Sequence, residues 1–128
     1  MVVGLTLFIF MTKNKDSTRY YSTQQEINVA QAIDGRRTPN SGATLFFKGD
    51  VVTRSFCLEC KTQTKEKKSF SIQKEWIQKL QEEAFSSGKP NWAIAFNFGG
   101  EDQSTNYYII NEYLFKKLVR EEDEQCKP

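Results

Sequence analysis

Two acidic residues and a lysine lie within one short stretch, GDVVTRSFCLECK, at residues 49–61. Apolar residues on both sides of Arg54-Ser55 predict a β-hairpin that turns at this pair. Asp50 and Glu59 are equally distant from the turn, so antiparallel pairing would place them directly across from each other. Directly opposed residues have Cβ atoms roughly 4.5–5.5 Å apart. Two carboxylates that close repel each other unless a cation lies between them, so this stretch constrains both the fold and the chemistry.

The spacing of Glu59 and Lys61 adds a basic group to the same site. Because side chains alternate along a strand, Glu59 and Lys61 share one face, and Leu58 and Cys60 turn to the other. A hard divalent cation such as Mg²⁺ takes oxygen ligands and often uses only one or two carboxylates, leaving positions for water and phosphate. The Lys61 ammonium could then hold a scissile phosphate, or orient and deprotonate the attacking water.

The residue types present exclude several kinds of site. The chain has no histidine, which excludes histidine-based zinc sites, Ser-His-Asp triads and the histidine-dependent nucleases. The cysteines are Cys57, Cys60 and Cys126, an odd number in a chain without a convincing secretory signal. This predicts reduced thiols in a cytoplasm. Cys57 and Cys60 would face opposite sides of a strand, so we favour structural burial over metal binding, which stays the alternative.

Basic residues gather in places where DNA could approach. The net charge is only +2, so local clusters matter more than the total. Arg36 and Arg37 fall in a predicted loop at residues 35–42, where they are either DNA-backbone contacts or parts of an ordinary solvated turn. A lysine-rich run at residues 62–68, which includes Lys65, is expected to follow phosphates as a mobile strand end or loop. Lys74, in the first turn of a later helix, can also face DNA.

Hydrophobic periodicity predicts an α/β fold with a central mixed β-sheet flanked by helices. Ser22 or Thr23 would cap a first helix that runs to residue 33, with Glu26 in its first turn. Ser69 or Ser71 would start a second helix that ends near residue 86. Strands are expected at residues 50–52, 56–61, 92–98 and 107–110. Asn111 would cap a last helix over residues 112–124, with a packing stripe of Tyr113, Leu114, Leu118 and Val119.

These expectations divide the chain into three parts. Residues 1–21 form an N-terminal extension, residues 22–119 the folded domain, and residues 120–128 an acidic and frayed C-terminal tail. The apolar run at residues 1–11 is too short to span a membrane and lacks the features of a signal peptide, so no membrane partner is expected. It is either a packed extension or a stretch upstream of a true start at Met11.

The order of these features resembles a known family. The pattern D-x8-E-x-K formed by Asp50, Glu59 and Lys61 is similar to that of the PD-(D/E)xK nuclease superfamily. Together with Glu26 upstream and the SGA and KGD elements at residues 41–43 and 48–50, it resembles the archaeal-type Holliday junction resolvases and their phage-encoded relatives. The resemblance covers roughly residues 22–110.

The resemblance implies a restriction-endonuclease-like core that cuts branched DNA, such as four-way junctions, with Mg²⁺, for which Mn²⁺ could substitute. Asp50, Glu59 and the Cys60 backbone carbonyl would bind the metal, while Lys61 and Glu26 complete the catalytic set. Further implied residues are Ser41, beside the scissile phosphate, and Lys48, among the DNA contacts.

The resemblance also implies a homodimer, because resolvases of this kind cut two strands symmetrically. Its location would be the cytoplasm of a bacterial host, with the gene carried by a phage or prophage. Two alternatives stay open: a nuclease of the same fold that acts on other DNA structures, and a non-catalytic DNA-binding or structural domain whose hairpin carboxylates have no catalytic role.

Overall fold

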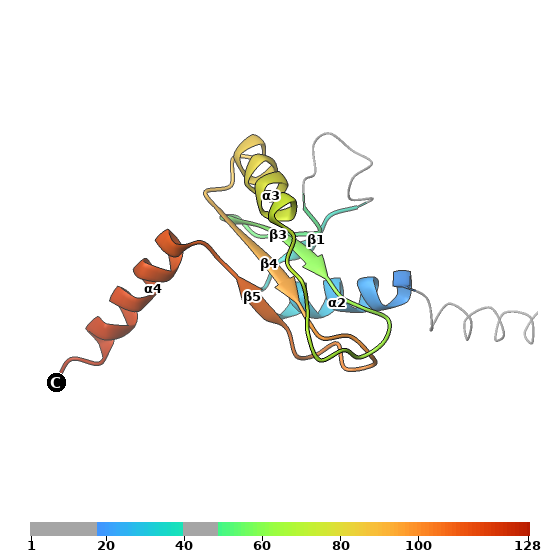
Figure 1. Cartoon of the computed structure of the whole chain (residues 1–128). Coiled ribbons are helices and arrows are strands. Elements are labelled where there is room, and N and C mark those ends of the chain that lie inside the picture. The colour runs from blue at the N-terminus through green and yellow to red at the C-terminus, as the bar shows by residue number, and fades with distance from the viewer. Residues whose placement is uncertain (1–17, 40–48) are drawn as a thin grey trace, which may run out of the picture.

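A five-stranded mixed sheet flanked by helices forms the body of the protein (Figure 1). The computed structural model describes residues 18–39 and 49–128. Its elements are, in chain order, α2 (Thr18–Ala32), β1 (Arg36–Arg37), β2 (Val51–Val52), β3 (Phe56–Lys61), α3 (Lys74–Ser86), β4 (Asn91–Phe96), β5 (Tyr107–Ile109) and α4 (Glu112–Gln125). The strands are ordered β1-β2-β3-β4-β5. Among the strands of the described residues, only β3 and β4 are parallel, and α3 connects them. The predicted α/β class with a mixed sheet is therefore confirmed.

The hairpin forms with the predicted register. Val51 pairs with Leu58 and Val52 with Cys57. The Thr53 amide donates to the Phe56 carbonyl at 3.0 Å, and the Thr53 hydroxyl accepts from the Phe56 amide at 3.0 Å. These bonds close the turn at Arg54-Ser55. One step beyond β2 the ladder becomes irregular, because the Asp50 amide also donates to the Leu58 carbonyl, at 2.8 Å. Asp50 therefore lies beside β3 without the regular pairing to Glu59 that the sequence predicted.

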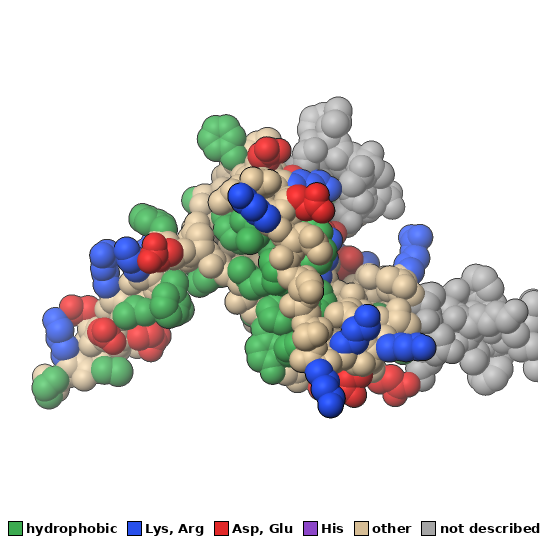
Figure 2. All heavy atoms as spheres, in the orientation of Figure 1, with side chains coloured by type: hydrophobic (Ala, Val, Ile, Leu, Met, Phe, Trp, Pro, Cys, Tyr) green, Lys and Arg blue, Asp and Glu red, His purple; other side chains and the backbone are tan. Residues whose placement is uncertain are grey.

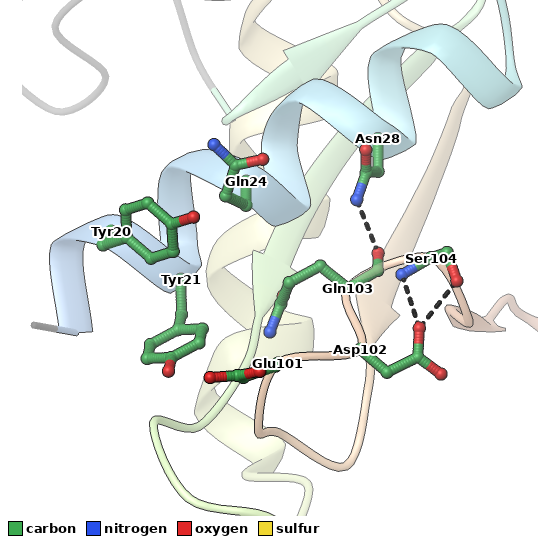
Figure 3. Close-up of a pocket in the computed structure, with 8 residues that line it drawn as sticks. All are labelled: Tyr20, Tyr21, Gln24, Asn28, Glu101, Asp102, Gln103 and Ser104. Carbon is green, nitrogen blue, oxygen red and sulfur yellow. Dashed lines mark hydrogen bonds between the residues drawn. The ribbon is translucent and has the colours of Figure 1, made fainter. Parts of the chain in front are cut away.

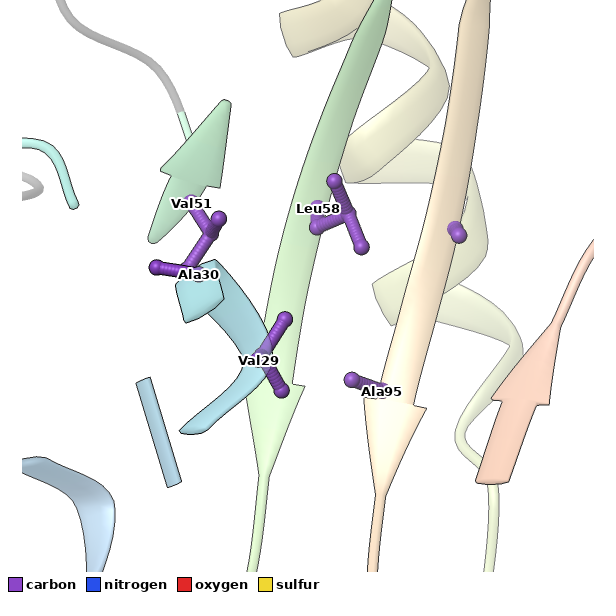
Figure 4. Packing of buried hydrophobic residues seen from close by; sticks show 6 residues of the cluster. Val29, Ala30, Val51, Leu58 and Ala95 are labelled. Atoms are coloured by element: carbon purple, nitrogen blue, oxygen red, sulfur yellow. The ribbon is translucent and has the colours of Figure 1, made fainter. Parts of the chain in front are cut away.

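The two faces of the sheet bury separate apolar clusters. On one face, α2 contributes Val29 and Ala30 to a cluster with Val51, Leu58, Ala93 and Ala95 (Figure 4). On the other face, α3 contributes Leu80 and Ala84 to a cluster with Cys57, Trp92 and Ile94. Neighbouring residues of β3, Cys57 and Leu58, thus point to opposite sides, as the strand period requires.

The N-terminal part of the fold corrects two expectations. Helix α2 already includes Thr18, so Ser22 and Thr23 lie inside it and do not cap it, and Glu26 lies in mid-helix and not in the first turn. Tyr21 is buried on this helix, one turn before Gln25, and this burial extends the helix toward the N-terminus. The predicted loop at residues 35–42 contains strand β1, because Arg36 and Arg37 pair with Val52 and Val51.

The later elements agree with the expectations in kind but differ at their ends. Helix α3 begins at Lys74, after Gln73, and not at Ser69 or Ser71. Gln73 makes no side-chain capping bond, so the sequence offers no capping signal at the true start. Strands β4 and β5 are shorter than predicted by one or two residues at their C-terminal ends.

Helix α4 differs most from its prediction. Asn111 caps it as expected, with its side-chain oxygen accepting from the Leu114 amide at 2.9 Å. The helix continues to Gln125, so the predicted frayed tail is helical through most of its length. The predicted packing stripe is wrong for the single chain, because no residue of α4 is buried. Figure 1 shows α4 projecting away from the sheet, and Figure 2 shows hydrophobic side chains exposed along it.

Candidate active site

The hairpin brings Asp50, Glu59 and Lys61 to one end of β3. The Cys60 amide donates to Asp50 Oδ2 at 2.9 Å, which links Asp50 to the strand that carries the other two residues. Lys61 Nζ lies 3.5 Å from Glu59 Oε1, and the two side chains are 29% and 27% exposed. The predicted acidic pair and lysine are therefore gathered in one partly buried cluster.

The environment of Glu59 raises its pKa to about 7. Burial is the largest cause, and the negative charge of Asp50 is the second; Lys61 acts in the opposite direction. A carboxyl group that is both desolvated and next to another carboxylate is held toward its protonated form. A cation at this position would remove part of that cost, so the electrostatics favour a cation there.

Lys61 is held from two sides. Its ammonium lies over the Trp76 ring, 4.4 Å from the ring centroid, in a cation–π contact with the first turn of α3. Its backbone carbonyl accepts a 2.8 Å hydrogen bond from Gln25 on α2. Helices on both faces of the sheet thus restrain this one residue of β3.

Gln25 is a residue that sequence reasoning missed. It is fully buried, and its Nε2 also donates to the Ala95 carbonyl at 3.2 Å and to Asn106 Oδ1 at 3.1 Å. Its Oε1 has no hydrogen-bond partner among the described residues. The spacing of Tyr21, Gln25 and Val29, four residues apart on one helix face, is the signal that could have identified this polar residue as buried.

A network of polar side chains continues from Gln25 across the C-terminal ends of β3 and β4. The Asn97 amide donates to Gln103 Oε1 at 3.0 Å and to Asn106 Oδ1 at 3.2 Å. Asn97 Oδ1 accepts from the Thr62 hydroxyl and from the Gly99 amide. Asn97 and Gln103 are both buried. These bonds fix the loop after β4 against the residues that follow Lys61.

Glu26, on α2, is the other carboxylate on which the charge of Asp50 acts. Arg37 Nε donates to Glu26 Oε1 at 3.3 Å. Burial raises the pKa of Glu26, the charge of Asp50 raises it further, and Arg37 lowers it. Glu26 is therefore electrostatically coupled to Asp50, and Arg37 from β1 balances its charge. Glu26 can therefore influence the site through its electrostatic interaction with Asp50.

The remaining predicted DNA contacts are spread over the surface. Arg36, Lys65 and Lys74 are exposed, and Lys74 lies in the first turn of α3 as expected. The run at residues 62–68 is bonded to the loop after β4, since the Lys67 amide donates to the Phe98 carbonyl at 2.8 Å. The expected mobile segment is thus anchored. Ser41 and Lys48 lie outside the described residues.

Cys57 and Cys60 lie in or against the two apolar clusters, which agrees with the prediction that these cysteines are structural. Cys57 is buried in the cluster beneath α3, whereas Cys60 packs against the cluster beneath α2. Burial is the main reason why the pKa of Cys57 is raised to about 12 and that of Cys60 is raised as well. Among the described residues, none of the three cysteines forms a disulfide.

The donor atoms at the hairpin fit a magnesium ion better than a soft metal. Residues 18–39 and 49–128 contain no group of three or more His, Cys, Asp or Glu side chains placed to hold a metal. A zinc site built from side chains therefore finds no support in this part of the chain. Magnesium often needs only one or two carboxylates and completes its shell with water and phosphate. Asp50 and Glu59 supply two such carboxylates.

A separate polar pocket of about 390 Å³ lies between α2 and the loop after β4. Its lining residues are Tyr20, Tyr21, Gln24, Asn28, Glu101, Asp102, Gln103 and Ser104 (Figure 3). Asn28 donates to the Gln103 carbonyl at 2.8 Å, and Asp102 accepts two bonds from Ser104. These bonds to Ser104 are the main cause of the lowered pKa of Asp102. None of the predicted site residues lines this pocket.

Comparisons with protein-family models, curated proteins and solved structures found no match. In the described ranges, 18–39 and 49–128, no helix has the length and apolar character needed to cross a membrane.

Proposed function

We propose that this protein is a Mg²⁺-dependent endonuclease that hydrolyses phosphodiester bonds in branched DNA, with a restriction-endonuclease-like core. The observation that carries the proposal is the gathering of two carboxylates and a lysine at one end of β3. The Cys60 amide bonds Asp50 Oδ2 at 2.9 Å, and Lys61 Nζ lies 3.5 Å from Glu59 Oε1 on the same strand. The elevated pKa of Glu59 supports the proposal, because its causes include the charge of Asp50.

Asp50, Glu59 and the Cys60 carbonyl would hold the cation. When bound, Mg²⁺ polarises the phosphate and lowers the pKa of a coordinated water. Asp50 is linked to β3 by its hydrogen bond from the Cys60 amide, so its carboxylate is oriented before any ion arrives. Mn²⁺ prefers the same oxygen ligands and would substitute.

Lys61 would act on the phosphate or on the attacking water. Its ammonium already lies near Glu59 and against Trp76, so positive charge is present without a large rearrangement. A positioned cationic group can stabilise the charge that develops on the phosphate in the transition state. Glu26, with its charge balanced by Arg37, would assist Asp50 from the side of α2.

DNA would approach along the surface that carries the exposed basic residues. Arg36 on the edge strand β1 and Lys74 at the start of α3 lie on elements that adjoin the cluster. Lys65 lies on the loop that follows Lys61. Such contacts fix the position of the DNA backbone without reading its sequence. A homodimer would present two such sites for paired cuts, in the cytoplasm of a bacterial host of a phage or prophage.

Cleavage of a synthetic four-way junction tests this function. Purified protein with Mg²⁺ should introduce paired symmetric nicks in a labelled junction and leave a linear duplex of matched sequence intact. Lys61→Ala should reduce the rate by at least about a hundredfold. Lys116→Ala, which removes a lysine from the surface of α4, is the matched control and should cut like the wild type.

The alternatives predict different outcomes in the same assay. Equal cutting of junction and duplex would retain the nuclease and reject branched DNA as its preferred substrate. Binding of either DNA without any cutting, in Mg²⁺ and in Mn²⁺, would favour a non-catalytic DNA-binding domain.

A further inference from the structure

An apolar groove of about 490 Å³ lies between α4 and the sheet. Its floor and walls are formed by Ile33, Thr53, Ser55, Phe56, Leu58, Ala93, Tyr108, Ile110, Leu114 and Leu118. The groove thus occupies the part of the α2-side face that lies toward the hairpin turn. Because Leu114 and Leu118 belong to α4, this helix forms one wall of the groove.

Helix α4 exposes an unusual amount of apolar surface. Phe115 is 55% exposed, Leu118 46% and Val119 39%. At 100° per residue, these residues and Leu114 form one continuous stripe. Tyr113 lies about 140° around the helix from Leu118 and is outside the stripe. An apolar helix face that its own chain leaves uncovered typically marks a site where another protein binds.

The charges beside the stripe indicate which partner fits. Lys117 and Glu121, four residues apart, lie on the same flank of α4. When two copies of a helix pack antiparallel about a two-fold axis, each flank meets the same flank of the other copy in reverse order. With the axis near Val119, Lys117 of each copy would face Glu121 of the partner subunit. The flank is therefore complementary to itself in the antiparallel arrangement.

We propose that α4 is the dimerisation element, and that α4 of a second copy lies antiparallel in the groove between the sheet and the first α4. The incoming helix would cover the stripe on one side and Phe56 and Tyr108 on the other. A C2 interface of this kind uses the same patch on both subunits. A specific interface typically buries roughly 800 Å² per partner, more than two short helices supply alone, so the sheet wall is an essential part of the surface.

This arrangement leaves the candidate active site accessible. Phe56 borders the groove, whereas Lys61 lies at the opposite end of β3, roughly 17 Å away along the strand. This interface is the surface through which the homodimer expected for the proposed nuclease would form, so the inference rests on the proposed function. Its tests measure oligomeric state, so they can fail while cleavage is retained, and the reverse.

The apolar part of the interface is tested by light scattering during gel filtration and by analytical ultracentrifugation. The wild type should be a dimer, and Leu118→Glu should raise the dissociation constant at least about a hundredfold, because it places a charge in the centre of an apolar contact. Tyr113→Glu, on the opposite side of α4, is the matched control and should remain dimeric. Circular dichroism checks that all three proteins keep their helix content. A wild type that is monomeric at about 100 μM, or a Leu118→Glu variant with unchanged affinity, would overturn the proposal.

The antiparallel order is tested by exchanging charges. Lys117→Glu and Glu121→Lys should each weaken the dimer by roughly tenfold, because each creates two like-charged pairs. The double variant Lys117→Glu/Glu121→Lys should recover most of the wild-type affinity, since opposite charges face each other again. Failure of the double variant to recover any affinity would contradict the antiparallel pairing.

Cross-linking gives an independent check of the same geometry. In the antiparallel pair, the two Cys126 residues would be separated by roughly 21 Å along the helix axes, so mild oxidation should not link the subunits of the wild type. Leu118→Cys in a Cys126→Ser background places the two thiols near the axis and should give a disulfide-linked dimer. Linking through Cys126 in place of residue 118 would indicate a parallel pair and reject the proposal.

Discussion

At the scale of single residues, the site is defined by charges that the fold brings close together and by the groups that restrain them. Glu59 carries the clearest electrostatic signature, because burial and the charge of Asp50 raise its pKa from 4.5 to about 7. Lys61 lowers that pKa without cancelling the other two effects. In the absence of a cation, the folded state therefore favours the protonated form of Glu59 more strongly than the unfolded chain does.

This shift predicts a pH dependence of stability. A carboxyl group whose pKa is raised on folding stabilises the fold fully below its unfolded pKa, and this contribution is lost as pH rises through the folded pKa. Without divalent cations, the Glu59 contribution should fall between about pH 4.5 and 7, by up to about 3 kcal/mol. Urea unfolding at several pH values measures it. Glu59→Gln should remove this part of the pH dependence, and an unchanged profile would contradict the description of Glu59.

Gln25 predicts a second effect at this scale. Gln25→Leu removes the bonds to the Lys61 and Ala95 carbonyls and to Asn106 Oδ1, which keeps its bond from Asn97. We expect a loss of about 2 kcal/mol in the free energy of unfolding and a lower rate of DNA cleavage. The exposed Gln31 on the same helix is the control, and Gln31→Leu should stay within about 0.5 kcal/mol. Equal effects in denaturant melts of the two variants would reject a special role for Gln25.

At the scale of elements, the parts that were predictable are those fixed by local interactions. The hairpin follows from residues that lie close in sequence, and the Asn111 cap of α4 follows from its side chain and the first turn that it bonds. Strand β1 was missed because Arg36 and Arg37 pair with Val52 and Val51, far along the chain. The start of α3 was missed because Gln73 carries no side-chain capping bond.

The isolation of α4 predicts that its stability depends on its cap. None of its residues is buried within the chain, so the helix has little packing to compensate for a lost capping bond. Asn111→Ala should cost about 1 kcal/mol locally and speed hydrogen exchange of the amides in residues 112–125. The exchange of β3 and β4 should not change. Uniform acceleration throughout the described residues would show instead that α4 unfolds together with the sheet.

At the scale of the whole molecule, the candidate active site and the apolar groove lie at opposite ends of strand β3. The C-terminal end of β3 holds the candidate active site, with α2 on one face and α3 on the other. The opposite end of the same strand borders the groove next to α4. The sequence indicated an apolar stripe on α4 but included Tyr113 and omitted Phe115, and periodicity alone does not tell whether the same chain or a second copy covers it. The Gln25 contacts were likewise not predictable, because Lys61, Ala95 and Asn106 are distant in sequence.

The central claim is that Asp50 and Glu59 together bind a divalent cation, and calorimetric titration of the DNA-free protein with Mn²⁺ tests it most directly. The wild type should bind Mn²⁺, Asp50→Asn and Glu59→Gln should each weaken binding at least about tenfold, and Glu75→Gln on the exposed side of α3 should bind like the wild type. Unchanged Mn²⁺ affinity in both hairpin variants would contradict the account.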